Sequence, residues 1–533
     1  MAVAVGLVAV AAPSAAWAQA CARNITADVV VFDQPLMFNR LGSQNVNGIM
    51  YALRRDVVDK NTLQSCGNAC QAGLVTLRPD KRPRPLVIRV AAGDCLDVAF
   101  QNLLNPPVNP ANPPHPNLLV DDPGLDRRAS FHAQGLELRT SMLDDGSFVG
   151  NAAVSGLVTP GVSTIYKYYA PKEGTFLVTS HGATFGSDGA AGNNTNGMFA
   201  VVNVEPAGAN FYRSQVTEEE MRLALDTANP ASCPASAAGV TPVVAATPGY
   251  TCGGQPILDY EATYPSLAAD GVTPTVWALE GKGGLPVLNM LAGLSLVHSD
   301  LNAVITGNAG NGSFPITTYP LESKGFNNPT LPNRLEPFRE YTVVFHDEAA
   351  VANAFPLWVA RTVNGAPNPL AHTLHAVGDV FQINYGSGAI GPEVIANRLG
   401  VGPMHDCLDC AYEEFFLTSP AVGDPAMVVD IPAVTGLEAC TPGVAPGTGV
   451  CAAIGPKAHM AFYPDDPSNV HHSYISDHVK FRNVHTGKEH HIFHLHNHQW
   501  LFNPNDDNSN YLDAQGIGPG AGYTYEINFG GSG

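Results

Sequence analysis

A dense group of histidines near the C-terminal end constrains this chain more than any other feature. Five of its 18 histidines fall within residues 490–498. They are interspersed with apolar residues typical of a strand: Ile492, Phe493, Leu495 and Trp500. Because side chains alternate along a strand, His494, His496 and His498 would share one face. His491 would point to the other face. Imidazole binds Cu, Zn, Fe and Ni, so the pattern predicts a metal site rather than a solvated histidine-rich tract.

The composition is that of a turn-rich β protein. Of the 533 residues, 45% are hydrophobic and only 14% are charged, with 53 Gly and 43 Pro. A chain of this length is too long for one hydrophobic core. Runs of strand-forming residues recur along it, separated by turn signals. We therefore predict an all-β fold of two or three β-sandwich domains with a long irregular insertion.

The strand pattern divides the chain into segments. Residues 21–206 carry enough strands for one sandwich. Residues 207–335 are less regular and form either an insertion or a small intermediate domain. The strand pattern resumes in residues 336–533, which would hold one or two further sandwiches.

Two local patterns are specific enough to name. Leu86–Val98 reads as a β-hairpin with a turn at Gly93-Asp94. Thr217–Thr227 has helical composition, and it opens with a Thr followed three residues later by Glu220, which is a capping-box pattern.

The N-terminal residues 1–20 resemble a secretory signal. They are rich in Ala and Val, and Ala16–Ala20 satisfies a small-x-small cleavage rule. The basic start of such signals is missing, which indicates a true N-terminus further upstream. A lipoprotein with Cys21 as the modified residue is the alternative. No later apolar run reaches the ~18 residues that a membrane helix needs. We expect an exported protein, periplasmic or extracellular, without a membrane span.

Export implies an oxidising compartment in which the ten cysteines can pair. Three pairs are close enough in sequence to form disulfides: Cys66 with Cys70, Cys407 with Cys410, and Cys440 with Cys451. The Cys407–Cys410 pair, next to His405, is alternatively a metal or redox site.

The charge balance restricts the partners. Twenty-seven basic and 47 acidic residues give a formal net charge of -20. A negative field repels phosphate backbones, so nucleic acid is not an expected partner. The same field attracts small cations, which is compatible with a metal ion as substrate.

Six short segments occur in the order seen in the multicopper oxidases, and together they span most of the chain: Pro85–Asn102, Phe131–Gly135, Thr159–Tyr169, Gly174–His181, Met198–Pro206 and His491–His498. The chain therefore resembles this cupredoxin-type family, in particular its large bacterial members. The resemblance implies cupredoxin-like Greek-key sandwiches. It also implies a blue type 1 copper that takes electrons from the substrate, and a three-copper cluster between domains that reduces O2 to water.

The resemblance assigns the metal ligands residue by residue. His491 matches a type 1 copper ligand. His132 and His494 match the two type 2 ligands, and His181 and His496 match type 3 ligands. Taken singly, His132 or His181 could equally be a hydrogen-bonded, half-buried histidine.

Two motifs of the first sandwich depart from the family pattern. Where the family has His-x-His-Gly, this chain has His132-Ala133-Gln134-Gly135, and Thr179-Ser180-His181 replaces His-Ser-His. In the family, the two replaced histidines serve the same type 3 copper. We therefore expect that one copper of the cluster is lost or held by other ligands, while the type 2 pair persists.

The His-Cys-His motif that closes the family pattern is absent. It supplies the thiolate that a blue copper site needs, so of the type 1 ligands only His491 is present. The chain reads as a fragment that ends just before this motif, and by itself it is not expected to complete a blue site.

These features predict an exported copper-dependent oxidoreductase that couples the one-electron oxidation of a metal ion or phenol to O2 reduction. One alternative is a non-catalytic copper-binding or resistance protein with a degenerate cluster. Another is a zinc hydrolase, in which three histidines hold the metal and Glu489 is the nearby acid.

Overall fold

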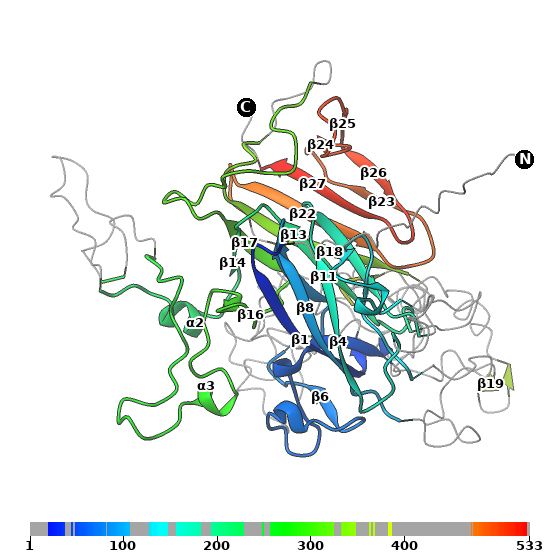
Figure 1. Ribbon diagram of the computed structural model, residues 1–533, viewed down its shortest axis with the longest axis vertical. Coiled ribbons are helices and arrows are strands. Elements are labelled where there is room, and N and C mark those ends of the chain that lie inside the picture. Colours follow the sequence, from blue (N-terminus) through cyan, green and yellow to red (C-terminus); the bar gives the residue numbers. More distant parts are fainter. Residues whose placement is uncertain are drawn as a thin grey trace, which may run out of the picture.

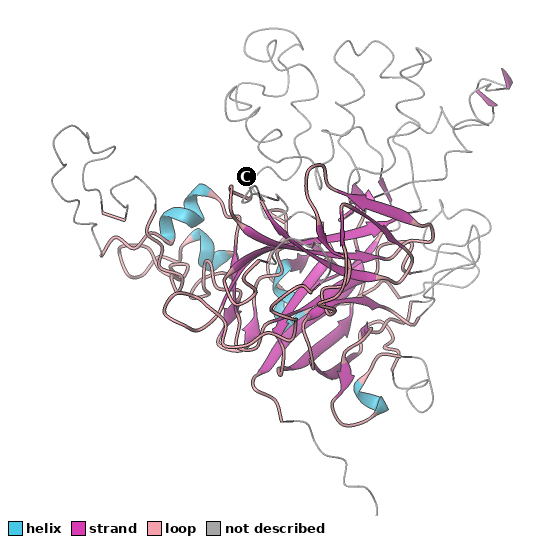
Figure 2. Ribbon diagram, turned by 90° about the horizontal axis from the view of Figure 1, so that it is seen from above, coloured by secondary structure: helices cyan, strands magenta, loops and turns pink. Residues whose placement is uncertain are grey.

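The computed structural model describes residues 20–37, 44–45, 48–81, 83–106, 127–147, 156–182, 193–228, 248–249, 256–324, 332–347, 362–363, 366–367, 382–385, 471 and 473–529. Strands dominate these residues (Figures 1 and 2), which confirms the predicted all-β fold. The α-helices, α2 (Glu218–Leu223) and α3 (Val276–Leu279), are short and lie to one side of the sheets. The predictions for residues 1–19 and for Cys407, Cys410, Cys440 and Cys451 fall outside the described residues.

Three larger sheets form the body of the molecule. The first is seven-stranded, with the order β10 (Glu137–Leu138), β11 (Ser163–Tyr169), β8 (Cys95–Asn102), β1 (Asn24–Asp33), β16 (Ser295–Leu296), β15 (Leu291–Ala292), and with β4 (Ile49–Leu53) paired to β1. The second, four-stranded, runs β7 (Leu86–Ala91), β13 (Phe199–Glu205), β12 (Gly174–Thr179), β9 (His132–Ala133). The third, six-stranded, runs β14 (Asn210–Arg213), β17 (Asn302–Thr306), β18 (Phe338–His346), β22 (His478–His485), β27 (Gly522–Asn528), with β21 (Gln382–Ile383) paired to β18.

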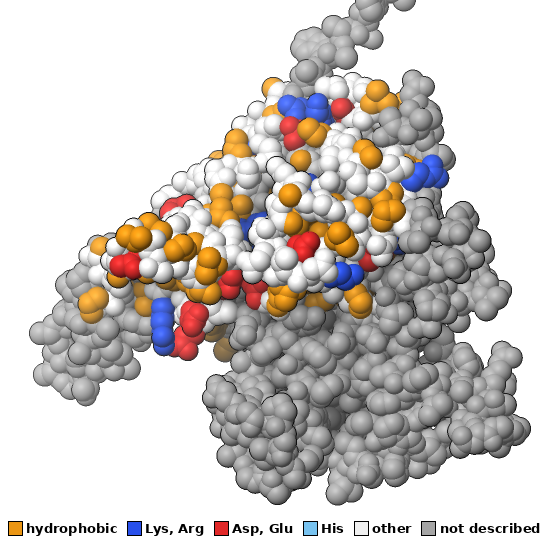
Figure 3. Space-filling view, turned by 90° about the horizontal axis from the view of Figure 1, so that it is seen from below, with side chains coloured by type: hydrophobic (Ala, Val, Ile, Leu, Met, Phe, Trp, Pro, Cys, Tyr) orange, Lys and Arg blue, Asp and Glu red, His pale blue; other side chains and the backbone are white. Residues whose placement is uncertain are grey.

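The remaining strands form short two-stranded sheets. They are β2 (Leu36–Met37) with β3 (Gln44–Asn45), β5 (Val57–Asp59) with β6 (Val75–Leu77), β19 (Thr362–Val363) with β20 (Ala366–Pro367), β23 (His491–His494) with β26 (Ala514–Ile517), and β24 (Trp500–Leu501) with β25 (Tyr511–Leu512). The surface shown in Figure 3 carries few charged side chains, set among apolar and uncharged polar ones, in keeping with the low charged fraction.

The four-stranded sheet is the middle layer of the molecule. All seven residues of β13 are buried. Alternate residues Ala200, Val202 and Val204 join the core shared with the first sheet. The intervening positions face the third sheet, where the side chain of Asn203 donates to Glu340 (3.0 Å). Because β13 is covered on both faces, most of its residues are apolar. Burial of each Val stabilises the folded state by about 1.5–3 kcal/mol relative to an exposed Val.

The predicted hairpin at Leu86–Val98 is wrong. β7 pairs with β13 in the four-stranded sheet, whereas β8 pairs with β1 and β11 in the seven-stranded sheet. The turn itself is present, with Gly93 at a φ of 91° and the Asp94 carboxylate accepting the Ala91 N–H (2.8 Å). The same turn chemistry serves a hairpin and a crossing between the two sheets of a sandwich. Only packing distinguishes them, because β7 is buried at all six positions.

The capping box predicted for the helix is confirmed. The Thr217 hydroxyl accepts the Glu220 N–H (3.2 Å), and the Glu220 carboxylate accepts the Thr217 N–H (3.1 Å). The helix ends at Leu223, so it is shorter than predicted. The surrounding residues 207–335 contribute β14 and β17 to the third sheet and β15 and β16 to the first. This segment therefore contributes strands to both the first and the third sheet.

Two disulfides stabilise the first sandwich. Cys66 pairs with Cys70, as predicted, and Cys21 pairs with Cys95. A lipoprotein would carry its lipid on the Cys21 sulfur, which is here in a disulfide. Every cysteine in the described part of the chain is oxidised, which is consistent with export. Among the described residues, none of the helices has the length and apolar character to cross a membrane.

A buried network of charged side chains joins the middle sheet to the third sheet. Arg482 on β22 donates to Glu205 on β13 (2.6 Å) and to Glu340 on β18 (2.9 Å), and Arg89 on β7 donates to Glu340 (2.8 Å). All four side chains are fully buried. Burial raises the pKa of Glu340, but the two guanidinium groups outweigh it and bring the pKa to about 2.

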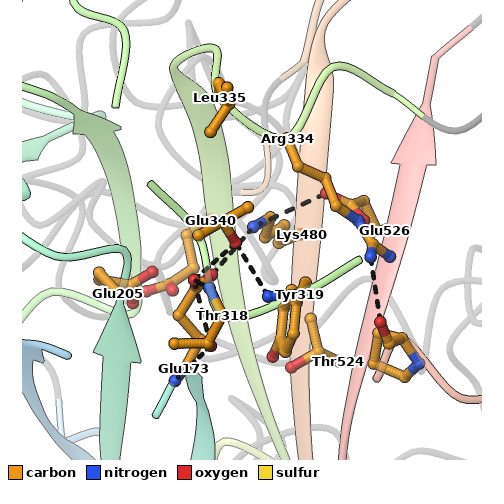
Figure 4. A network of polar contacts seen from close by, with 12 residues as sticks. Glu173, Glu205, Thr318, Tyr319, Arg334, Leu335, Glu340, Lys480, Thr524 and Glu526 are labelled. Carbon is orange, nitrogen blue, oxygen red and sulfur yellow. Dashed lines mark hydrogen bonds and ion pairs between the residues drawn. The ribbon is translucent and has the colours of Figure 1, made fainter. Parts of the chain in front are cut away.

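The network continues across the third sheet (Figure 4). The Lys480 ammonium lies between the carboxylates of Glu173 (3.8 Å) and Glu526 (3.6 Å), and it sits 4.1 Å from the ring centre of Phe338. Arg334 donates to Glu526 from the other side. The contact between the two sheets is thus made by buried, hydrogen-bonded ionisable groups as well as by apolar side chains.

Candidate metal centre

The histidine-rich segment is a strand only in its first part. β23 ends at His494, and a turn follows in which the N–H of His498 donates to the carbonyl of Leu495 (3.4 Å). Asn497 occupies the left-handed region in this turn, with a φ of 61°, which Asn tolerates better than most residues. The prediction that His494, His496 and His498 share one strand face is therefore wrong, because the strand stops before the second of them.

The turn brings His494 and His496 together in another way. Their ring centres are 4.9 Å apart, and both side chains are exposed. The Nδ1–H of His494 donates to the carbonyl of Asp513 (2.6 Å). A neutral imidazole has one N–H and one lone pair, so the lone pair of His494 lies on Nε2.

His132 and His181 form a second pair at the edge of the middle sheet, with ring centres 4.4 Å apart. The Nδ1–H of His132 donates to the carboxylate of Asp145 (2.7 Å), which also accepts the Tyr168 hydroxyl (2.8 Å). Burial opposes ionisation of Asp145, but the contacts with His132 and Tyr168 lower its pKa overall. The lone pair of His132 is therefore on Nε2. Burial, together with the nearby His132, lowers the pKa of His181.

The two positions that depart from the family motifs lie next to this pair. Thr179 is directly opposite His132 in the ladder between β9 and β12. It is 1% exposed, and its hydroxyl has no hydrogen-bond partner among the described residues. Gln134 is half-buried, and its backbone N–H donates to Leu177 (2.9 Å) on the same strand, β12. A small hydroxyl thus stands beside His132 where the family pattern has an imidazole.

Asp347, His485 and His491 form a third group, of which the sequence analysis identified only His491. Their ligand atoms all lie within 4.8 Å of one another. The Asp347 carboxylate is 2.8 Å from Nε2 of His491 and 3.4 Å from Nε2 of His485. Asp347 and His485 are fully buried, and the His491 side chain is 21% exposed. Nothing in the strand-like context of Asp347 marks it, because its partners are more than 130 residues away in the sequence.

The middle sheet meets the ends of β18 and β22, the strands of the third sheet that precede the histidine segment. The rings of Phe199, at the start of β13, and His346, at the end of β18, are 5.2 Å apart. The side chain of Asn194 bonds to Thr486, which directly follows β22. Thr179, opposite His132, is paired with Phe199. The end of β22, which leads toward the histidine segment, and the end of β12 that precedes His181 therefore both lie near the start of β13.

The structure brings the five predicted ligands together only in part. His132 lies with His181, His494 lies with His496, and His491 lies with Asp347 and His485. Within the described ranges, the trio that contains His491 is the one set of three potential ligands whose atoms fall within 4.8 Å. The other four form two pairs, one at the middle sheet and one on the histidine segment.

The buried His346 gives the site region a measurable pH dependence. Burial lowers its pKa from 6.5 to about 4, so the ring is neutral in the folded chain. The unfolded chain takes up the proton first, and the free energy of unfolding therefore falls as the pH drops from 6.5 to about 4. We expect a loss of about 3 kcal/mol from this group. Urea unfolding at several pH values across this range should show that the free energy of unfolding of His346→Gln depends less on pH than that of the wild type. An equal pH dependence would contradict the role given to His346.

Comparison with known proteins gives no match to any protein-family profile and none to a curated protein. Among solved structures, a copper nitrite reductase from Nitrosomonas europaea is 9% identical over 96% of this chain and 86% of its own, with a TM-score of 0.34. A multicopper oxidase is 11% identical over 96% and 81%, with a TM-score of 0.33. A blue copper oxidase from Nitrosomonas europaea is 12% identical over 96% and 77%, with a TM-score of 0.32.

These three solved structures are copper oxidoreductases, and one is a multicopper oxidase, the family that the sequence motifs resemble. Their TM-scores all lie below 0.5 and their identities below 25%.

Proposed function

We propose that this chain is an exported copper-dependent oxidoreductase of the multicopper oxidase type. It would couple the one-electron oxidation of a metal ion or a phenol to the reduction of O2. Copper supplies the reversible one-electron chemistry when bound, and the histidines of the chain supply the ligands.

The observation that carries this proposal is the orientation of His132 and His494. In each ring an acceptor holds Nδ1–H, the Asp145 carboxylate in one case and the Asp513 carbonyl in the other. Both rings therefore keep the lone pair on Nε2. Metal-binding histidines are held in this way, with the second nitrogen donating to a carboxylate or carbonyl that fixes the tautomer.

We assign His132 and His494 to a type 2 copper and His181 and His496 to the remaining type 3 copper. Thr179 and Gln134 occupy the positions of two further ligands in the family pattern. A threonine hydroxyl is a poor ligand for copper compared with imidazole. The proposal is therefore a reduced cluster, in which one type 3 copper is missing or is held by other residues.

The reductant would approach near His491, the partly exposed member of its group. The net charge of -20 favours a cation over an anion at this surface. Fe(II), Mn(II), Cu(I) and phenols are the candidates to be compared.

The test is reconstitution of the 533-residue chain with copper. We expect tight copper binding with a type 2 EPR signal and without blue absorption, because of the type 1 ligands only His491 is present. Copper-dependent O2 uptake with at least one of these reductants is expected once a His-Cys-His segment supplies the type 1 thiolate. Total copper should equal the copper detected by EPR, because a complete type 3 pair is magnetically coupled and silent. A surplus equal to a coupled pair per chain would contradict the reduced cluster, and failure to bind copper would overturn the proposal.

A second candidate is a non-catalytic copper-binding or resistance protein, and the replacement of ligands at Thr179 and Gln134 favours it. It predicts tight copper binding without O2 uptake from any of the four reductants, even when a His-Cys-His segment supplies the type 1 thiolate. A zinc hydrolase, the third candidate, requires that zinc compete successfully with copper for the same histidines.

A further inference from the structure

A short turn presents the carboxylate that holds His132. The turn contains a 3-10 helix at Met142–Asp144, which opens with a capping box in which the Asp144 carboxylate accepts the Ser141 N–H (3.0 Å). Asp145 follows directly and is 5% exposed. Its two oxygens lie 2.9 and 2.7 Å from Nδ1 of His132. The acceptor of the histidine proton thus comes from a turn that its own hydrogen bonds hold in shape.

The hydroxyl of Tyr168, on β11, links this turn to the strand that carries His132. Tyr168 is 1% exposed, and its Oη lies 2.8 Å from Oδ1 of Asp145 and 2.5 Å from the carbonyl oxygen of Phe131. Phe131 directly precedes His132 in the sequence. The one phenolic proton is shared between the two acceptors. A single buried group therefore contacts both the carboxylate and the backbone beside the imidazole.

Gly146 allows the turn to come this close. A Cβ at this position would lie 2.5 Å from the carbonyl oxygen and 2.7 Å from the nitrogen of Phe131. These are backbone atoms, which cannot move aside as the end of a side chain can. A larger residue here would displace Asp145 from both His132 and Tyr168.

We infer that Tyr168 is a positioning residue for His132 and acts through Asp145. Its hydroxyl holds the carboxylate in the orientation that keeps the histidine proton on Nδ1 and the lone pair on Nε2. Without the hydroxyl, the carboxylate loses a buried donor that restricts its rotation. The copper role of Nε2 rests on the proposed function, whereas the orientation of the ring does not.

The direct test is Tyr168→Phe, which keeps the ring and removes the hydroxyl. The measurement is NMR of the metal-free chain labelled with 15N-histidine at about pH 8, where imidazoles are neutral. The His132 signals are assigned by their loss in His132→Gln. We expect protonation on Nδ1 in the wild type and a mixture of tautomers in Tyr168→Phe. An unchanged tautomer in a variant with a native circular dichroism spectrum would overturn the inference. So would a wild-type ring protonated on Nε2, a result that needs no variant of Tyr168.

The matched control is Tyr166→Phe, two residues away on the same strand. Tyr166 is also 1% exposed, but its hydroxyl donates to the Gly156 carbonyl (2.8 Å) instead of the Asp145 carboxylate. This variant should keep the wild-type tautomer at His132. An equal change in both variants would mean that the core had loosened in general, and the role of Tyr168 would be refuted.

The consequence for the metal is tested by a double-mutant cycle. Tyr168→Phe should lower copper affinity by about 10-fold, the lower end of the range for groups that orient a ligand. Because Tyr168 acts through Asp145, adding Tyr168→Phe to Asp145→Asn should cause no further loss. Losses that add would overturn the inference. If the tautomers are as expected but the wild-type chain binds no copper, the proposed function fails and the positioning role stands.

Discussion

Replacement of Arg482 by alanine is expected to lower the free energy of unfolding by about 3–5 kcal/mol. The guanidinium pairs with Glu205 and Glu340 between two sheets, at positions with no exposure to water. Burial raises the pKa of Glu205, and Arg482 opposes that rise. Without it, Glu340 keeps Arg89 and Glu205 keeps only the charge of Lys480, so the pKa of both carboxyl groups should rise. Urea unfolding followed by tryptophan fluorescence measures the loss.

The control for Arg482→Ala is the same substitution at an exposed ion pair. Arg222 contacts Glu218 one turn away in α2, with both side chains at least 70% exposed. Arg222→Ala should change the free energy of unfolding by less than about 0.5 kcal/mol. If Arg482→Ala cost no more than this control, the buried network would not be what holds the middle and third sheets together.

Removal of either type 2 ligand is expected to have the second large effect. His132→Ala or His494→Ala should each weaken copper binding at the type 2 position by more than about 100-fold. This exceeds the 10–100-fold cost of losing a partner that only orients a ligand. Competition titration with a copper chelator of known affinity measures the change.

His498→Gln provides the matched control for these two variants. His498 lies in the same turn as His496, its Nδ1–H donates to the His496 carbonyl (2.8 Å), and its ring packs 4.6 Å from that of Phe529. It is not among the assigned ligands, so copper affinity should stay within a few-fold of wild type. A loss as large as that of His494→Ala would show that the histidines act as a collective cation-binding tract.

The elements that local chemistry determines were predictable from the sequence. The apolar alternation around Ser163–Tyr169 and the run Gly174–Thr179 become β11 and β12, and the capping box at Thr217 starts α2. The pairing of Cys66 with Cys70 follows from their proximity. Each of these features depends on residues that are close in sequence.

The features that depend on distant partners could not be predicted. The strand residues 479–482 alternate apolar and basic side chains, which is typical of a half-exposed strand. Lys480 and Arg482 are nevertheless fully buried, because the middle sheet and Glu526 cover them with carboxylates. Asp347 reaches His491 across 144 residues.

The early end of the histidine strand has a physical cause of the same kind. β23 pairs with β26 only as far as His494 opposite Ala514. Beyond this point the chain turns through Asn497. A sequence pattern with period two does not show where the partner strand stops. The prediction therefore continued the strand beyond His494, to His496 and His498.

The most direct test of the account asks whether one copper ion is held by His132 and His494 together. EPR of the chain with one equivalent of Cu(II), combined with 15N-histidine labelling to count coupled imidazoles, should give one signal with at least two imidazole nitrogens. The same signal should lose one nitrogen in His132→Ala and one in His494→Ala. A signal that changes in one variant and is untouched in the other would mean that the two sheets hold separate ions, and the shared copper site would be refuted.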